Sequence, residues 1–237
     1  IPFSTSEIRA ARGPKNVVDP RRPYAWLVED ELSARGLVEP VAVLFLTNRE
    51  CPFSCLYCDL WKNTTDESIE PGDILEQIDF ALEQLPPARS IKLYNSGNFF
   101  DPKAIPPHDL PAIAERVARF HTVIVENHPR FCTDACLHFR DQIRGQLEVA
   151  IGLATIHPEV LPALNKRMTV DDFDSAVEFL TSAGIHVRTF ILLRPPFLDE
   201  EEGVAWALKS VEHAFDAGAR VCSVIPTRGG DGLMPSL

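Results

Sequence analysis

VAVLFLTNRECPFSCLYC, residues 41–58, is the stretch that decides the fold of this chain. Its first six residues are apolar and predict a buried β-strand. Its last eight residues carry three cysteines, at positions 51, 55 and 58, and no further Cys or His lies between Arg49 and Glu70. Structural zinc takes four protein ligands, so three cysteines leave such a site incomplete. An iron–sulfur cubane takes thiolate ligands on four irons, and three cysteines leave one iron open for chemistry.

With Tyr57 directly before the third cysteine, this segment resembles the radical S-adenosylmethionine (SAM) enzymes. The resemblance implies a [4Fe–4S] cluster held by Cys51, Cys55 and Cys58, whose open iron chelates the amino and carboxylate groups of SAM. It also implies reductive cleavage of SAM to methionine and a 5′-deoxyadenosyl radical, which abstracts hydrogen from a substrate. The electron is expected from a flavodoxin- or ferredoxin-type donor. A zinc site, a disulfide framework and unrelated thiols remain the alternatives for the three cysteines.

Composition is typical of a globular enzyme that does not enter a membrane. The chain has 237 residues, of which 45% are apolar, enough for one domain with a large core. No apolar run approaches the roughly 20 residues that span a bilayer, and the first residues do not resemble a signal peptide. Six cysteines are too few for a disulfide scaffold and favour the cytoplasm. A net charge of −11 argues against a surface that coats nucleic acid.

Strand and helix patterns alternate along the chain. Helical patterns separate the apolar runs, which predicts parallel strands with crossover helices. We therefore expect an α/β fold, a partial (βα)6 TIM-type barrel, which is also the fold that the resemblance implies. Residues 1–40 are expected to form an N-terminal extension packed on the barrel, and residues 41–237 the core. The predicted strands are residues 41–46, 91–94, 122–125, 147–153, 187–193 and 221–225.

Capping signals predict where helices begin and end. Asp73 and Glu76 have capping-box spacing, and so have Thr169 and Asp172. A third predicted helix ends at Gly218. Its apolar face is expected to consist of Val204, Leu208, Val211 and Phe215.

Unusual loops follow the predicted strands, at the end of a barrel where chemistry is carried out. Asn95, Ser96 and Gly97 follow the second strand, where radical SAM enzymes bind the amino group of SAM; an ordinary turn is the alternative. Glu126 ends the third strand in a Glu-x-x-Pro setting, as in coproporphyrinogen-oxidase-like and Elongator-like enzymes. By that resemblance it contacts SAM, through charge-assisted hydrogen bonds to the ribose. The alternative is a solvated strand end.

Basic residues later in the chain are further candidates. Lys166 falls where relatives place a basic residue near the SAM carboxylate, although a surface lysine is the alternative. Ala154 departs from the Gly-Leu-Glu-Thr pattern of those relatives and removes a polar side chain from the pocket. Arg188 and Arg228 are weaker candidates for an anionic group.

Cys132 and Cys136 are four residues apart and would share one helix face. We predict that they are packing residues; the alternative is a second metal site with His128 or His138.

The widest resemblance is to the subgroup that includes the radical SAM component of archaeosine synthase. It covers most of the span from Val41 to Gly230, including residues 93–102, 194–197 and 225–230. Two substrate classes follow. Charge favours a small metabolite or biosynthetic intermediate, and the resemblance favours transfer RNA. A cluster-carrying electron-transfer or sensor protein is the third possibility, and the loops after the second and third strands argue against it.

Overall fold

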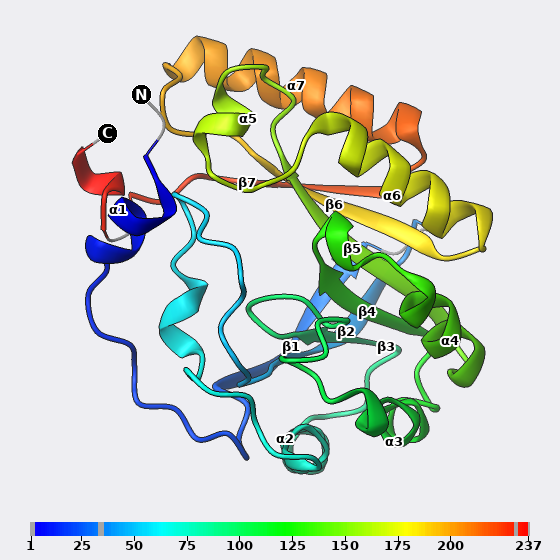
Figure 1. The fold of residues 1–237 in the computed structure, drawn as a ribbon. Helices are drawn as coiled ribbons and strands as arrows, with labels where there is room; N and C mark the ends of the chain where they lie inside the picture. The colour runs from blue at the N-terminus through cyan, green and yellow to red at the C-terminus, as the bar shows by residue number, and fades with distance from the viewer. Residues whose placement is uncertain (1–2, 33–35, 230–231, 237) are drawn as a thin grey trace.

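The computed structural model describes residues 3–32, 36–229 and 232–236. A curled seven-stranded sheet runs in the order β1 to β7, with β1 antiparallel to β2 and every other pair parallel. Helices cover its outer face and leave the inner face as the barrel interior (Figure 1). The expected partial barrel is confirmed. The strands are β1 Ala25–Leu32, β2 Val38–Phe45, β3 Ser90–Tyr94, β4 Thr122–Asn127, β5 Gln146–Ala154, β6 His186–Leu192 and β7 Val221–Ile225.

The helices alternate with these strands. The α-helices are α1 Thr5–Ala10, α2 Asp73–Gln84, α3 Leu110–Arg116, α4 Asp134–Gln142, α5 Val160–Ala163, α6 Val170–Ser182 and α7 Glu200–Ala217. Short 3₁₀ turns are η1 Leu60–Asn63, η2 Pro107–Asp109, η3 Pro129–Phe131 and η4 Met234–Ser236. Within the described part of the chain, none of these helices has both the length and the apolar character needed to cross a membrane.

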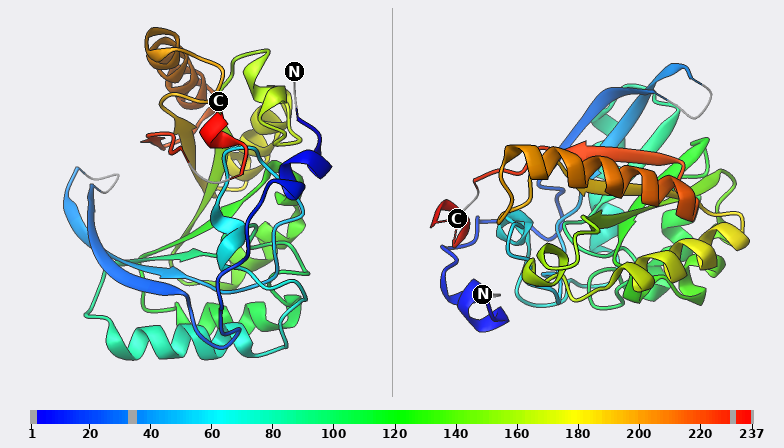
Figure 2. Two further views of the ribbon diagram at one scale, coloured as in Figure 1. Left: turned by 90° about the vertical axis from the view of Figure 1, so that its left-hand side faces the viewer. Right: turned by 90° about the horizontal axis from the view of Figure 1, so that it is seen from above.

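Strand β1 lies in the region that we expected to form an extension packed on the barrel. It pairs with β2 from Ala25 opposite Phe45 to Leu32 opposite Val38, and the hairpin curves along one edge of the sheet (Figure 2). Strand β2 begins at Val38, before the expected boundary at residue 41. The division into an extension and a core stays a prediction.

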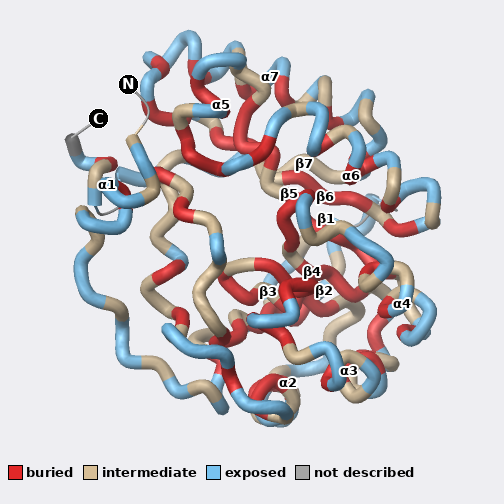
Figure 3. Tube along the Cα trace, viewed as in Figure 1, coloured by how far each residue is buried: buried red, intermediate tan, exposed pale blue. Residues whose placement is uncertain are grey.

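The core lies between the outer face of the sheet and the helices. Alternate strand residues such as Leu93, Val125 and Val149 are fully buried there, against Ile78 of α2 and Phe173 of α6. Figure 3 shows this burial along the strands and the inner sides of the helices. Burying each such side chain contributes about 1.5–3 kcal/mol. The intervening strand residues face the barrel interior.

Of the two predicted capping boxes, one is confirmed and the other is wrong. Thr169 and Asp172 form the expected capping box of α6, with Asp172 Oδ2 2.7 Å from the Thr169 amide. Helix α2 also begins at Asp73, but the expected box with Glu76 is wrong. Its N-cap is Gly72 at φ +93°, whose amide donates to Asp109. Because Asp73 is already inside the helix, its carboxylate bonds back to the Glu70 amide instead.

Helix α7 ends at Gly218 as predicted, but of its expected apolar face only Val211 packs against the core. Val204, Leu208 and Phe215 are 44%, 60% and 49% exposed. The helix turns small residues toward the rest of the protein: Gly203, Ala207, Ser210 and Ala214. A Cβ at Gly203 would lie 3.1 Å from Arg194, so a close approach of backbones selects the small residues.

Candidate functional site

The cysteine loop follows β2 and is held from the far side of the barrel. Cys51, Cys55 and Cys58 line one cavity of about 400 Å³ inside the barrel, together with Tyr57. The Leu56 amide donates to the Leu164 carbonyl at 2.9 Å. Contacts of this kind from the segment after α5 fix a loop that has little regular structure of its own.

The donor set fits an iron–sulfur cluster. Burial raises the pKa of the Cys51 thiol to about 11 and of the Cys58 thiol to about 12, so binding as thiolates requires a nearby positive centre. In the described residues, no three His, Cys, Asp or Glu side chains gather closely enough for one metal ion. A cubane distributes its cysteine ligands over separate irons, so the thiols need to face one cavity and not converge on one point.

Lys166 places a buried positive charge beside these thiols. Its Nζ donates to the Tyr57 hydroxyl at 3.3 Å, and the residue is 9% exposed. Burial lowers its pKa, but the neighbouring Tyr57 hydroxyl and Cys55 thiol favour the charged ammonium and raise the pKa above the ordinary value. Gly152 makes room for the ammonium, because a Cβ there would lie 2.9 Å from Nζ. The residue is not the surface lysine of the alternative interpretation.

Glu126 holds the loop that follows β3. Its Oε1 accepts the amides of Asn95 at 2.7 Å and Gly97 at 3.3 Å, and it lines the same cavity as the cysteines. Burial raises its pKa to about 7, and the hydrogen bonds from those backbone amides oppose this rise. Glu126 is therefore not a solvated strand end.

The three candidates after β3 point in different directions. Ser96 and Gly97 line the cavity, and Ser96 Oγ lies 2.8 Å from the Tyr24 hydroxyl. Asn95 does not line it, because its side chain donates to Asn48 Oδ1 at 2.7 Å while Asn48 donates back to the Asn95 carbonyl. Asn95 thus ties its loop to the chain just before the cysteines, a role that the sequence pattern did not indicate.

Asn98 and His128 join the cysteine loop to β4 and were not among the predicted site residues. Asn98 Nδ2 donates to Cys51 Sγ at 3.3 Å, and its Oδ1 accepts the His128 amide at 2.8 Å. The His128 ring stacks on Phe53 with centroids 4.0 Å apart. Asn98 belongs to the Asn-Ser-Gly-Asn turn, residues 95–98. Its polar residue type was the only feature of the sequence that could have indicated a role in the site.

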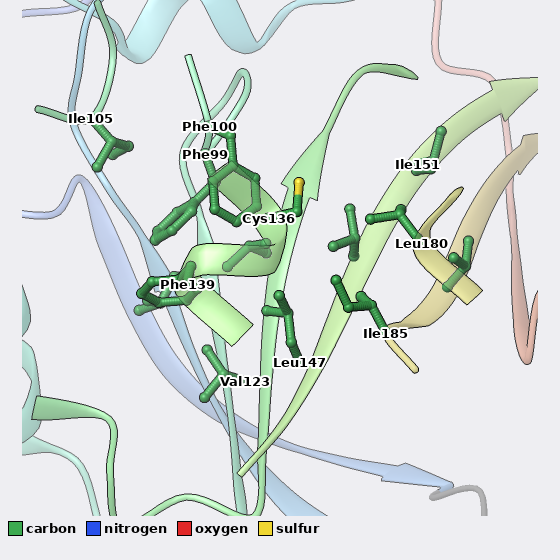
Figure 4. Close-up of a cluster of buried hydrophobic side chains, with 14 of the residues drawn as sticks. Phe99, Phe100, Ile105, Val123, Cys136, Phe139, Leu147, Ile151, Leu180 and Ile185 are labelled. Atoms are coloured by element: carbon green, nitrogen blue, oxygen red, sulfur yellow. The ribbon is translucent and has the colours of Figure 1, made fainter. Parts of the chain in front are cut away.

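His128 is fully engaged and not arranged as a metal ligand. Its Nε2 lies 3.0 Å from the Lys166 carbonyl and its Nδ1 accepts the Arg130 amide at 3.2 Å. Burial lowers its pKa to about 4. The predicted packing role of the nearby thiols agrees with their positions: Cys136 is fully buried beside Phe99, Phe100 and Phe139 (Figure 4). That these thiols bind no second metal stays a prediction.

A buried ion network lies in the barrel below this cavity. Arg188 bonds Glu148 at 2.6 Å and Glu31 at 2.8 Å, and Lys92 bonds Glu31 at 2.5 Å and Glu29 at 2.7 Å. These charges join β1 to β3, β5 and β6. Arg188 is thus neutralised by carboxylates, which leaves it no role as the anion-binding rim residue we considered. Arg228 does lie at the cavity.

Comparison with known proteins assigns the family. Residues 46–207 match the family described as the Radical SAM superfamily. The chain belongs to the radical SAM superfamily. The cofactors of this superfamily are a [4Fe–4S] cluster and SAM, as we expected from the sequence.

The sequence relatives include two proteins named archaeosine synthase subunit beta. An uncharacterized protein, MJ0550 of Methanocaldococcus jannaschii, is 22% identical over 227 residues, which are 90% of this chain and 62% of that protein. Archaeosine synthase subunit beta of Methanosarcina acetivorans is 26% identical over 170 residues, 68% of this chain and 49% of that protein. The chain thus spans about half the length of the curated relatives that it matches.

Solved structures share the fold. Methylornithine synthase (PylB) matches 80% of this chain and 56% of its own, with a TM-score of 0.58 and 15% identity. Coproporphyrinogen III oxidase (HemN) from Escherichia coli matches 95% of this chain and 48% of its own, with a TM-score of 0.53 and 12% identity. Both likenesses support the partial barrel.

Proposed function

We propose that this chain cleaves SAM reductively and uses the resulting 5′-deoxyadenosyl radical to abstract hydrogen from a substrate. The observation that carries the proposal is one cavity of about 400 Å³ that gathers the three cysteines, Lys166 and the loop fixed by Glu126. When bound, the cluster supplies the electron for this cleavage. The single electron originates from a flavodoxin- or ferredoxin-type donor.

Each side chain in the cavity has a proposed task. Cys51, Cys55 and Cys58 hold the cluster. Lys166 faces the SAM carboxylate, since it is a permanently charged donor at the cavity wall. Gly97 and Ser96 accommodate the amino group, as their place beside Cys51 suggests: a Cβ on Gly97 would lie 3.6 Å from the Cys51 Cβ. Asn95 acts through its backbone, because its side chain is engaged elsewhere.

Glu126 and Tyr57 have supporting roles in the same proposal. Glu126 shapes the loop after β3 through two backbone amides and offers negative charge to the ribose. The Tyr57 hydroxyl accepts a hydrogen bond from the Lys166 ammonium at 3.3 Å and so positions the ammonium. A buried cation bonded to a neutral hydroxyl retains its charge for a ligand.

A small molecule is the substrate class that the cavity supports best. Beyond the cysteines, its wall consists largely of apolar and aromatic side chains, including Phe45, Tyr94, Phe190 and Leu192. Such a wall suits a compact ligand that is mostly desolvated, with few polar contacts. The acidic charge of the chain, −11, agrees with this class, and a cytoplasmic location stays part of the prediction.

Transfer RNA is the second candidate substrate. The observation in its favour is similarity to two archaeosine synthase beta subunits, including that of Thermococcus kodakarensis at 31% identity over 128 residues. That relative is matched over 40% of its length. An RNA substrate would have to flip one base into the barrel, because the cavity is too small for a duplex.

The decisive experiment combines iron content with SAM cleavage. Anaerobically reconstituted protein is expected to bind about four irons and four sulfides and to release 5′-deoxyadenosine from SAM with dithionite as reductant. Cys55→Ala should abolish both, whereas Cys222→Ala, a thiol in strand β7 outside the cavity, should change neither. Wild-type iron and cleavage in Cys55→Ala would refute the proposal. Filter binding of unmodified transfer RNA then tests the second substrate class.

A further inference from the structure

A second cleft lies on the outer side of the cysteine loop. It measures about 570 Å³ and is bounded by the N-terminal segment at Arg9–Lys15, the loop at Arg49–Pro52, and Trp61. The N-terminal segment runs along this loop in Figures 1 and 2. Cys51 lines both this cleft and the inner cavity, as do Arg12, Glu50 and Trp61, so these four residues lie between the two spaces.

The charge of this cleft is opposite to that of the whole chain. Although the chain carries −11, five cationic side chains and three carboxylates line the cleft. The cations are Arg9, Arg12, Lys15, Arg49 and Lys103, and the carboxylates are Glu50, Asp66 and Asp101. A local patch of this sign attracts acidic partners and orients them before contact.

Four of the five cations fall into two groups, and the fifth, Arg9, donates from Nε to Ser54 Oγ at 2.9 Å. Arg12 and Lys15 bind Glu50 at 2.7 and 2.8 Å, which fixes the N-terminal segment to the residue next to Cys51. Arg49 and Lys103 have no ion pair with any described residue; Arg49 is 3.5 Å from the Ser68 hydroxyl. Lys103 is exposed. The second group therefore leaves positive charge available to a partner.

We propose that this cleft is where a small acidic redox protein docks to deliver the electron. The inference rests on the proposed function and adds the place and the charge of the contact. One electron leaves the partner, which is oxidised, and enters the cluster, which is reduced; no bond is made or broken. Docking here brings the partner to the wall that Cys51 forms, and electron transfer is fastest over a short path.

A nucleic acid fits the cleft less well. Nucleic acid is bound through basic patches that neutralise its phosphates, and each carboxylate within such a patch repels the phosphate backbone. Here Glu50 and Asp66 lie among the cations and already bind Lys15. Mixed charge around a positive excess is typical of transient contacts between proteins, where rim charges control the association rate.

The first experiment measures docking directly. A purified acidic flavodoxin is titrated into the reconstituted protein by calorimetry, and the double variant Arg49→Glu/Lys103→Glu is compared with Arg144→Glu/Arg220→Glu. The control makes the same charge change at exposed positions before β5 and β7, at the opposite ends of the strands. We expect Kd to rise at least about tenfold in the cleft variant and less than about twofold in the control. The difference should shrink at about 1 M salt, where screening is strong.

The second experiment separates this inference from the proposed function. With dithionite the cleft variant should cleave SAM at the wild-type rate, and with reduced flavodoxin it should be slower. No cleavage by the wild type with dithionite would refute the proposed function, while the calorimetry still tests the cleft. Equal weakening in both double variants, or unchanged flavodoxin binding together with lost transfer RNA binding, would overturn the docking site.

Discussion

The ammonium of Lys166 lies 3.3 Å from the hydroxyl of Tyr57 at the wall of the cavity that the three cysteines line. These residues are far apart in sequence, and the segment after α5 brings them together. The contact fixes a permanent positive charge where an anionic ligand group can reach it.

Lys166→Met is therefore expected to weaken SAM binding. Losing one charge-assisted hydrogen bond costs about 1.5–3 kcal/mol, or roughly ten- to a hundredfold in affinity. Equilibrium dialysis with labelled SAM measures the affinity, and iron content should stay at the wild-type value. Arg167→Met, at the exposed neighbouring residue, is the control. Unchanged affinity in Lys166→Met would remove the lysine from the SAM site.

Gly152→Ala should reproduce part of that effect on SAM affinity although the lysine itself is not replaced. A Cβ would lie 2.9 Å from Lys166 Nζ, so the ammonium has to move. We expect weaker SAM binding by about threefold to tenfold, the range of a displaced hydrogen bond. Gly229→Ala, where a Cβ meets nothing within 4 Å, is the matched substitution. Equal affinities in the two variants would show that the position of the ammonium is unimportant.

Glu126→Gln retains the shape of the side chain and its carbonyl oxygen but removes the charge. We expect SAM affinity to fall by about ten- to a hundredfold, with iron content unchanged. Because the pKa of Glu126 is about 7, the charged acceptor forms as pH rises from 6 to 8. Wild-type affinity should increase over that range, and affinity of the variant should not. Lost iron in the variant would instead identify Glu126 as structural.

The raised pKa of Glu126 should also make the free energy of unfolding depend on pH. Burial raises its pKa from 4.5 to about 7, so the folded state holds a proton that the unfolded chain has lost. The contribution of Glu126 is fully present below pH 4.5 and is lost as pH rises to about 7. Urea unfolding of cluster-free protein at pH 5 and pH 8 should show the wild type losing stability relative to Glu126→Gln. An equal difference at both pH values would contradict the raised pKa.

Arg188→Met should destabilise the barrel. The substitution leaves Glu148 without its cation, while Glu31 keeps Lys92, and breaking a buried ion pair costs about 3–5 kcal/mol. Urea unfolding measures the loss, and Arg220→Met, at an exposed residue, should change stability by less than about 0.5 kcal/mol. Adding Glu148→Gln to Arg188→Met should restore part of the loss. A further loss in that double variant would mean that charge is not the cause.

Cys132→Ala/Cys136→Ala should retain the full iron content. Cys136 is fully buried in the core, so the substitution is expected to cost about 1–2 kcal/mol in stability through lost packing. Iron and sulfide analysis after reconstitution checks the prediction. Loss of about half the iron, judged against four irons for one cluster, would reveal a second cluster.

The cysteine motif and the strands that alternate with the helices could be predicted from the sequence, because the signals for both are local. Residues 41–46 are a continuous apolar run, and Thr169 with Asp172 satisfy a capping pattern within four positions. Loops at the carboxyl ends of parallel strands must share one rim, so the sequence places Cys51, Gly97 and Glu126 together, and all three line one cavity.

What the tertiary structure alone decided depends on contacts between distant segments. Strand β1 pairs along the edge of β2, and it supplies both partners of Lys92 and, in Glu31, one of the two partners of Arg188. On α7 the small residues face the protein, where Gly203 lies close to Arg194, in place of the larger apolar ones that periodicity favoured. Asn95 and Asn98 have side chains of the same type in one turn, yet the first bonds Asn48 and the second Cys51. Side-chain direction in such a turn depends on the neighbouring loops, which a local pattern does not contain.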